Sequence, residues 1–146
     1  MKLKDILLKK GSKVWTVKSS KTIQNAIEIL VNQKIGALVV LDENDRISGI
    51  ISERDIIRGC HTHPREMSEF PVSRFMTKQV IIASPEDETG YIMGIMTQSR
   101  IRHVPVVSDG KLQGIVSIGD VVKSVIDDSN FEIHYLKEYI LGRAEP

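Results

Sequence analysis

The sequence has little cysteine and little net charge. Its single cysteine, Cys60, excludes a disulfide bond within the chain and is typical of a protein in a reducing compartment. Lysine and arginine total 20 against 19 aspartates and glutamates, a formal net charge of +1, so no overall field attracts a polyanion or an anionic membrane. We therefore expect neither nucleic acid nor a membrane as a partner.

Long hydrophobic runs are also absent from the sequence. No apolar stretch approaches the roughly 18 residues that a membrane-spanning helix needs. The apolar run near the N-terminus, residues 6–8, is much too short for a secretion signal. These observations predict a cytoplasmic protein whose 146 residues suffice for one domain, or for two very small units that share a core.

The sequence contains an internal repeat. Residues 14–34 align with residues 80–100 without a gap, at a constant offset of 66 positions. The second repeat then has one residue fewer in a turn, so the offset falls to 65 and Asp55 aligns with Asp120. A unit of roughly 60 residues does not easily bury a sheet alone, so we expect the two repeats to pack together about a pseudo-twofold axis.

Each repeat has the pattern of a strand, a helix, a strand, a turn, a strand and a helix. Apolar residues recur at helical spacing over residues 23–31 and again over residues 89–96. The runs at 37–41 and 104–107 are almost continuously apolar, which predicts strands that are covered on both faces. The sequence thus predicts the same small α/β unit twice.

The helix starts and the domain boundaries follow from shorter signals. Ser19 or Ser20 is expected to cap the first helix, and the "SPED" stretch is expected to start its counterpart in the second repeat. We expect four segments along the chain, namely a first repeat at 1–60, a linker at 61–71, a second repeat at 72–128, and a C-terminal helix and tail at 129–146. The apolar stripe of that last helix requires burial on the domain or on a second subunit.

One motif occurs twice, as GIISERDII and as GIVSIGDVV. This pattern of glycine, two apolar residues, serine, two variable residues and aspartate resembles the signature of the CBS domain, a small regulatory module found in tandem pairs. The similarity extends upstream to IGALVV and RHVPVV. The resemblance implies an α/β (α+β) fold of two pseudo-symmetric repeats, each a small three-stranded sheet with two helices, packed sheet to sheet. It also implies two clefts between the repeats that bind adenosine-containing ligands.

The residue types in this motif suit such a ligand. A serine that ends a strand and an aspartate one helical turn later place a hydroxyl and a carboxylate near the start of a helix. A carboxylate accepts hydrogen bonds from ribose hydroxyls, and the free N–H groups at a helix start attract phosphate. The alternative is that Ser52 and Ser117 only cap helices, with the aspartates in favourable first-turn positions. The duplication favours the binding interpretation.

The resemblance divides the expected ligand-binding residues between two inequivalent clefts. One cleft would be lined by Ser52, Arg54, Asp55, Ala83, Arg102 and His103. The other would be lined by Ser117, Ile118, Asp120, Thr16, Ser19, Gly36 and Ala37. Guanidinium groups form forked, charge-assisted hydrogen bonds with phosphate. We therefore expect the cleft with Arg54 and Arg102 to take the more phosphorylated ligand.

The resemblance implies a stand-alone regulatory protein that binds AMP, ADP, ATP or NAD(H) and signals to a target protein. The resemblance also implies a homodimer. We expect no catalytic activity, because no base, nucleophile or metal constellation accompanies the binding groups. Cys60, His61 and His63 lie close together but lack the further ligands of a zinc site, so no metal is expected. The alternative is a dimeric interaction scaffold with empty clefts.

A short basic cluster lies near the N-terminus, at Lys9, Lys10 and Lys13. Clusters of this kind are usually solvated, so the sequence assigns it no role in either cleft.

Overall fold

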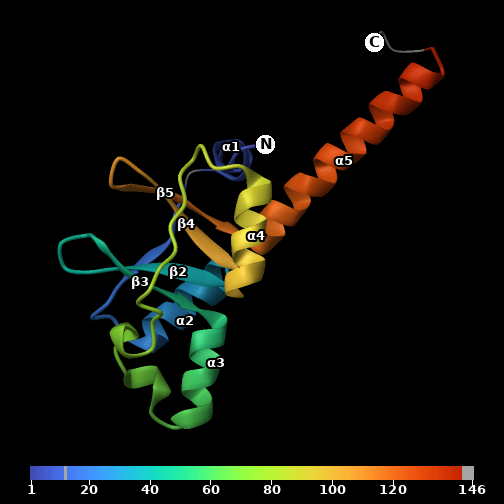
Figure 1. Ribbon diagram of the computed structural model, residues 1–146. Helices are drawn as coiled ribbons and strands as arrows, with labels where there is room; N and C mark the ends of the chain where they lie inside the picture. Colours follow the sequence, from blue (N-terminus) through green and yellow to red (C-terminus); the bar gives the residue numbers. More distant parts are fainter. Residues whose placement is uncertain (12, 143–146) are drawn as a thin grey trace. The chain divides into compact units, whose positions relative to one another are not determined.

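The computed structural model describes residues 1–11 and 13–142 (Figure 1). The chain divides into two compact units. The continuous unit is Lys13–Ile81, and the composite unit combines Met1–Ser12 with Ile82–Pro146. Each unit contains one repeat together with the segment that precedes the other repeat in the sequence.

The continuous unit is built on a three-stranded sheet in the order β1-β2-β3, with β1 parallel and β3 antiparallel to the central β2. Its elements are β1 (Thr16–Lys18), α2 (Ile23–Gln33), β2 (Ala37–Leu41), β3 (Ile47–Ser52), α3 (Glu53–Thr62) and the 3₁₀ turns η1 (Met67–Glu69) and η2 (Val72–Arg74). The predicted three strands and two helices of the first repeat are confirmed.

The composite unit has two hydrogen-bonded strands, β4 and β5, which pair antiparallel. Its elements are α1 (Leu3–Lys10), α4 (Thr89–Ser99), β4 (His103–Ser108), β5 (Lys111–Ser117) and α5 (Ile118–Ile140). The pairing of both hairpins is irregular at equivalent positions, between Val40 and Leu41 and between Val106 and Val107. The repeat in the sequence is therefore a repeat in the structure.

The prediction of a third strand in the second repeat is wrong. The expected strand is reduced to one bridge, in which Ala83 N–H donates to Pro105 O at 2.9 Å and Val107 N–H donates to Ala83 O at 2.8 Å. Immediately afterwards Ser84 and Asp87 close a turn, with Asp87 N–H donating to Ser84 O at 3.0 Å. This turn directs the chain away from the sheet before further pairs form.

Two predicted helix starts are also wrong. Thr22, rather than Ser19 or Ser20, caps α2, since its hydroxyl accepts from Asn25 N–H at 3.2 Å. The helix α4 begins at Thr89, because the "SPED" residues form the turn described above instead of a first helical turn. The buried residues of both helices nevertheless follow the predicted periodicity, with the exception of Val31 at the end of the stripe on α2.

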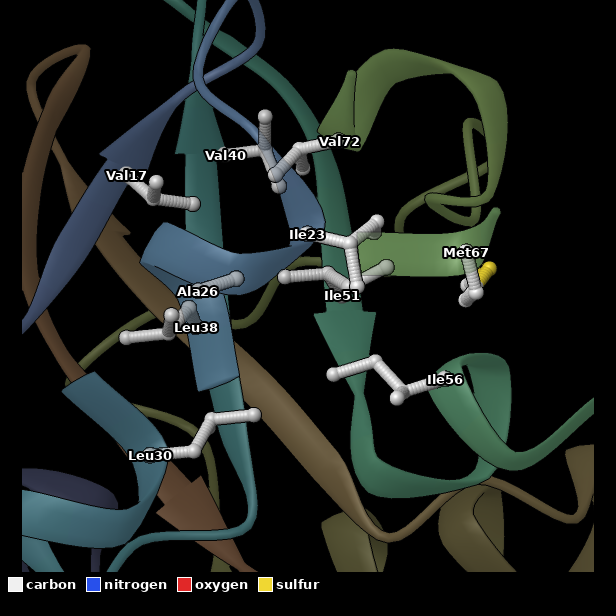
Figure 2. Close-up of a cluster of buried hydrophobic side chains, with 10 residues drawn as sticks. All are labelled: Val17, Ile23, Ala26, Leu30, Leu38, Val40, Ile51, Ile56, Met67 and Val72. Carbon is white, nitrogen blue, oxygen red and sulfur yellow. The ribbon is translucent and has the colours of Figure 1, made fainter. Parts of the chain in front are cut away.

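The core of the continuous unit lies between α2 and the sheet. Figure 2 shows its ten buried side chains, which are Val17, Ile23, Ala26, Leu30, Leu38, Val40, Ile51, Ile56, Met67 and Val72. Met67 lies within the expected linker, so that segment contributes to the core as well as connecting the repeats.

The core of the composite unit brings the N-terminal helix onto the second repeat. Leu3 and Ile6 of α1 are buried with side chains of α4, β4, β5 and α5. The helix α5 runs without a break from Ile118 to Ile140, and its later turns extend beyond α4 and the strands of this unit (Figure 1). The expected tail beyond residue 142 lies outside the described residues.

Within the described part of the chain, no helix combines the length and the apolar character that a membrane span requires.

Candidate functional site

Both serine–aspartate motifs form reciprocal caps at helix starts. Ser52 caps α3, where its hydroxyl accepts from Asp55 N–H at 3.3 Å and Asp55 Oδ2 accepts from Ser52 N–H at 2.9 Å. Ser117 caps α5 in the same way, with distances of 3.1 Å and 2.9 Å to Asp120. Both serines therefore cap helices, and the caps hold each carboxylate in a fixed place in the first turn, while the binding interpretation stays a prediction.

Capping engages one oxygen of the Asp55 carboxylate, and a neutral hydroxyl engages the other. Oδ2 accepts from Ser52, while Oδ1 accepts from the Thr77 hydroxyl at 3.3 Å. Thr77 is itself held against β3, since Ile50 N–H donates to Thr77 O at 3.0 Å and Thr77 N–H donates to Ile50 O at 2.8 Å. A hydroxyl at this distance is a weak partner that ligand hydroxyls can match.

Asp120 has a charged partner instead. The Lys10 ammonium donates to Asp120 Oδ2 at 2.7 Å and to Ile115 O at 2.8 Å. Partial burial of Asp120 opposes its ionisation, but the hydrogen bond from Lys10, together with bonds from Ser117 and the lysine charge, lowers its pKa overall. Lys10 thus has a specific partner that the sequence did not predict, although its side chain stays exposed to solvent.

The glycine of each motif allows the covering segment to approach its strand. A Cβ on Gly49 would lie 2.8 Å from Thr77 O, and a Cβ on Gly114 would lie 2.6 Å from the Leu7 side chain. The same segments place Thr77 beside Asp55 and Lys10 beside Asp120. Both glycines thus permit a close approach, and the approaching group is the protein's own chain.

Within each unit, the structure brings together residues that were predicted to line different clefts. In the continuous unit, Ala37 lies opposite Ser52 in the sheet and Gly36 O accepts from Glu53 N–H at 3.0 Å. In the composite unit, His103 lies opposite Ser117, and Arg102 O accepts from Ile118 N–H at 2.8 Å. The first unit also contains Thr16, Ser19, Arg54 and Asp55, and the second contains Ala83 and Asp120. Each predicted cleft draws on both units, so its assembly stays a prediction.

Cys60 and His61 lie in the last turn of α3, and His63 follows the helix directly. The ring of His63 meets the rings of Phe70 and Phe75 edge-on, with centroid distances of 5.3 Å and 5.7 Å. Across residues 1–11 and 13–142, no three histidine, cysteine, aspartate or glutamate side chains lie close enough together to hold a metal ion.

The Lys10–Asp120 pair predicts a pH-dependent contribution to stability. We expect Lys10→Met to lower the free energy of unfolding at pH 7 by about 1 kcal/mol, because Asp120 loses a short, partly buried ionic hydrogen bond. A lowered pKa in the folded state stabilises the protein above the unfolded value of about 3.9, and this contribution is lost as pH falls through the folded value. Urea unfolding between pH 2 and pH 7 measures the difference between the two proteins.

The matched control is Lys9→Met, on the neighbouring exposed position of α1. It should unfold like the unchanged protein at every pH. A difference for Lys10→Met that persists undiminished at pH 2 would contradict the assigned role of Asp120.

Comparisons with known proteins agree with the presence of two repeats in this chain. The family model described as CBS domain matches residues 3–61 and 72–127. The CBS domain-containing protein CBSX3, mitochondrial, of Arabidopsis thaliana is 36% identical over 136 residues, which are 90% of this chain and 66% of that protein. The crystal structure of the CBS-domain containing protein ATU1752 from Agrobacterium tumefaciens superposes with a TM-score of 0.81 at 42% identity, covering 84% of this chain and 91% of that one.

A third relative is a structure with bound ligands. The CBS domain pair of protein MJ0100, in complex with 5'-methylthioadenosine and S-adenosyl-L-methionine, has a TM-score of 0.78 and 27% identity, covering 88% of this chain and 98% of that one.

Proposed function

Because the chain belongs to the CBS domain family, we propose that it is a regulatory module that binds adenosine-containing nucleotides and signals to a target protein. The observation that supports this most directly is the pair of aspartates, Asp55 and Asp120, each held in the first turn of a serine-capped helix. A carboxylate offers about four lone-pair sites, so capping leaves acceptor capacity for the hydroxyls of a ribose. The MJ0100 pair binds two adenosine compounds, which supports the same ligand class here.

The two sites are proposed to prefer different ligands. Arg54 follows Ser52 by two positions in the first repeat, and Gly119 has the equivalent place in the second. We assign the more phosphorylated ligand to Asp55 with Arg54 and Arg102, since guanidinium groups bind phosphate in forked geometry. Lys10 adds a cation beside Asp120, but its charge is already compensated by that carboxylate. The Asp120 site is therefore assigned a ligand with fewer phosphates.

Titration calorimetry on protein stripped of bound ligand tests the proposal. The candidates are AMP, ADP, ATP, NAD, NADH, S-adenosylmethionine and 5'-methylthioadenosine. We expect Asp55→Ala and Asp120→Ala each to weaken binding at one site by about 10- to 100-fold, the effect of losing hydrogen bonds to a charged group. Arg102→Ala should weaken di- and triphosphates more than AMP.

The matched control is Glu132→Ala, an exposed acidic residue about three turns after Asp120 on the same helix, which should leave every affinity unchanged. If no candidate produces heat or thermal stabilisation, the alternative function, a dimeric interaction scaffold with empty clefts, replaces the proposal.

The proposed role is binding without catalysis. The groups at each helix start are a hydroxyl, a carboxylate and backbone N–H groups, which suit recognition of a ribose and a phosphate. Product formed from ATP or NADH by the purified protein would contradict this. The homodimer and the cytoplasmic location expected from the sequence stay predictions.

A further inference from the structure

One face of α5 has a seven-residue pattern of apolar side chains that is interrupted only at Ser129. Five of them are between 40% and 79% exposed, namely Val122, Ile126, Ile133, Leu136 and Ile140. Ile126, Ile133 and Ile140 recur every seven residues, and Val122 and Leu136 lie four positions before the first and the last of these isoleucines. In heptad notation the isoleucines are at position a, and Val122, Ser129 and Leu136 are at position d. We name these six residues the outer stripe.

The outer stripe is distinct from the face that α5 packs on its own unit. The buried residues of α5 are Val121 and Ser124. At 100° per residue, Ser124 lies about 160° and Val121 about 100° around the helix from the centre of the outer stripe. The later half of the helix, which holds Ile133, Leu136 and Ile140, extends beyond α4 and the strands of this unit (Figure 1). Among the described residues, the side chains of Ile133, Leu136 and Ile140 stay 51–79% exposed there.

A seven-residue apolar repeat has a specific structural meaning. It is slightly shorter than two turns of a straight helix, so two such helices keep their stripes in contact by supercoiling around each other. A β-branched residue at position a with leucine at position d favours two parallel strands, and this chain has isoleucine at the three named a positions and leucine at one d position, Leu136. We propose that α5 pairs with α5 of a second copy of this chain in a parallel, two-stranded coiled coil through the outer stripe.

The charges beside the outer stripe favour the parallel orientation. Glu132 is at position g and Lys137 is at position e, and both are exposed. In a parallel pair, position g lies beside position e of the next heptad in the other helix, so Glu132 meets the partner's Lys137 twice by symmetry. These two contacts are attractive.

An antiparallel pair would bring like charges together. Layering Ile126 on the partner's Leu136 places Lys123 near the partner's Lys137, and Glu132 near the partner's Glu132. Like charges in these flanking positions oppose association. The charge pattern thus selects the parallel arrangement, and Asp55 and Asp120 contribute nothing to it.

Disulfide trapping tests both the contact and its direction. In a Cys60→Ser background, Leu136→Cys places the two new thiols at one d layer of a parallel pair, within reach of a disulfide. Mild oxidation should convert most of the protein into a covalent dimer, seen on a non-reducing gel.

The matched control is Phe131→Cys. Phe131 lies on the opposite face of α5, and its side chain is 70% exposed. It should cross-link at least about 10-fold more slowly. Equal rates for the two variants would overturn the proposal.

Charge substitution gives an independent test in the reduced protein. The double variant Ile133→Asp with Leu136→Asp should raise the dimer dissociation constant by about 100-fold or more, measured by light scattering over a dilution series. Phe131→Asp should leave it unchanged, and circular dichroism verifies that each variant is folded. A dimer of undiminished stability in the double variant would overturn the helix pairing. Ligand titration of the same variant should be unaltered, which separates this result from a failure of the proposed binding function.

Discussion

Replacing Gly49 by valine is expected to lower the free energy of unfolding by about 3 kcal/mol, the upper range for forcing extra volume into a packed site. The reason is local, because a Cβ at this position would lie 2.8 Å from Thr77 O. That oxygen is a backbone atom and accepts from Ile50 N–H at 3.0 Å, so it moves only if the bridge to β3 breaks. Urea unfolding of the two proteins measures the loss.

The matched control is Gly94→Ala. Gly94 lies in α4 and has nothing within 4 Å of an added Cβ. Alanine there should stabilise the protein by about 0.5–1 kcal/mol, because glycine is a poor residue for a helix interior. A Gly49→Val protein within 1 kcal/mol of the original would show that the segment around Thr77 is free to move. The displaced Thr77 hydroxyl should also leave Asp55 with one partner fewer.

The second large effect is expected for Leu38→Ala. Leu38 lies on the central strand β2, is 0% exposed, and belongs to the core shown in Figure 2. Removing three buried carbon atoms leaves a cavity between α2 and the sheet. We expect a loss of about 3–4 kcal/mol in the free energy of unfolding, measured by denaturant titration.

Val31→Ala provides the comparison for this substitution. The periodicity of α2 predicts Val31 on the buried face, but this prediction is wrong, since the side chain is 67% exposed. Its truncation should change the free energy of unfolding by no more than about 0.5 kcal/mol. Equal losses for the two variants would mean that burial in this unit does not determine stability.

Local patterns predicted most of the secondary structure correctly. The strands β2 and β4 follow from apolar runs, and the serine caps of α3 and α5 follow from the motif itself. One error, at the start of α2, occurred where several capping residues compete. Ser19, Ser20 and Thr22 all precede α2, and only the last is followed three positions later by a residue that completes a capping box, Asn25.

Local sequence patterns could not predict the hydrogen-bond partners of Asp55 and Asp120. Lys10 and Asp120 are separated by 110 positions, and no periodicity links a lysine near the N-terminus to a helix in the second repeat. A signal was nevertheless present in α1, where Leu3, Ile6, Leu7 and Lys10 share one helical face. A stripe that ends in lysine indicates a helix docked beside an acid, but its partner depends on the tertiary fold.

The N-terminal helix α1 belongs to the composite unit, although the whole continuous unit follows it in the sequence. This order has a consequence for synthesis on the ribosome. The continuous unit, Lys13–Ile81, is complete in one stretch and can fold as soon as it emerges. The composite unit closes only when α1, made first, meets β5 and α5, made last. The apolar face of α1 therefore has no partner to bury it during most of translation. A fragment cut at the repeat boundary, residues 1–60, would retain that face while losing Met67, so the piece suited to separate expression is 13–81.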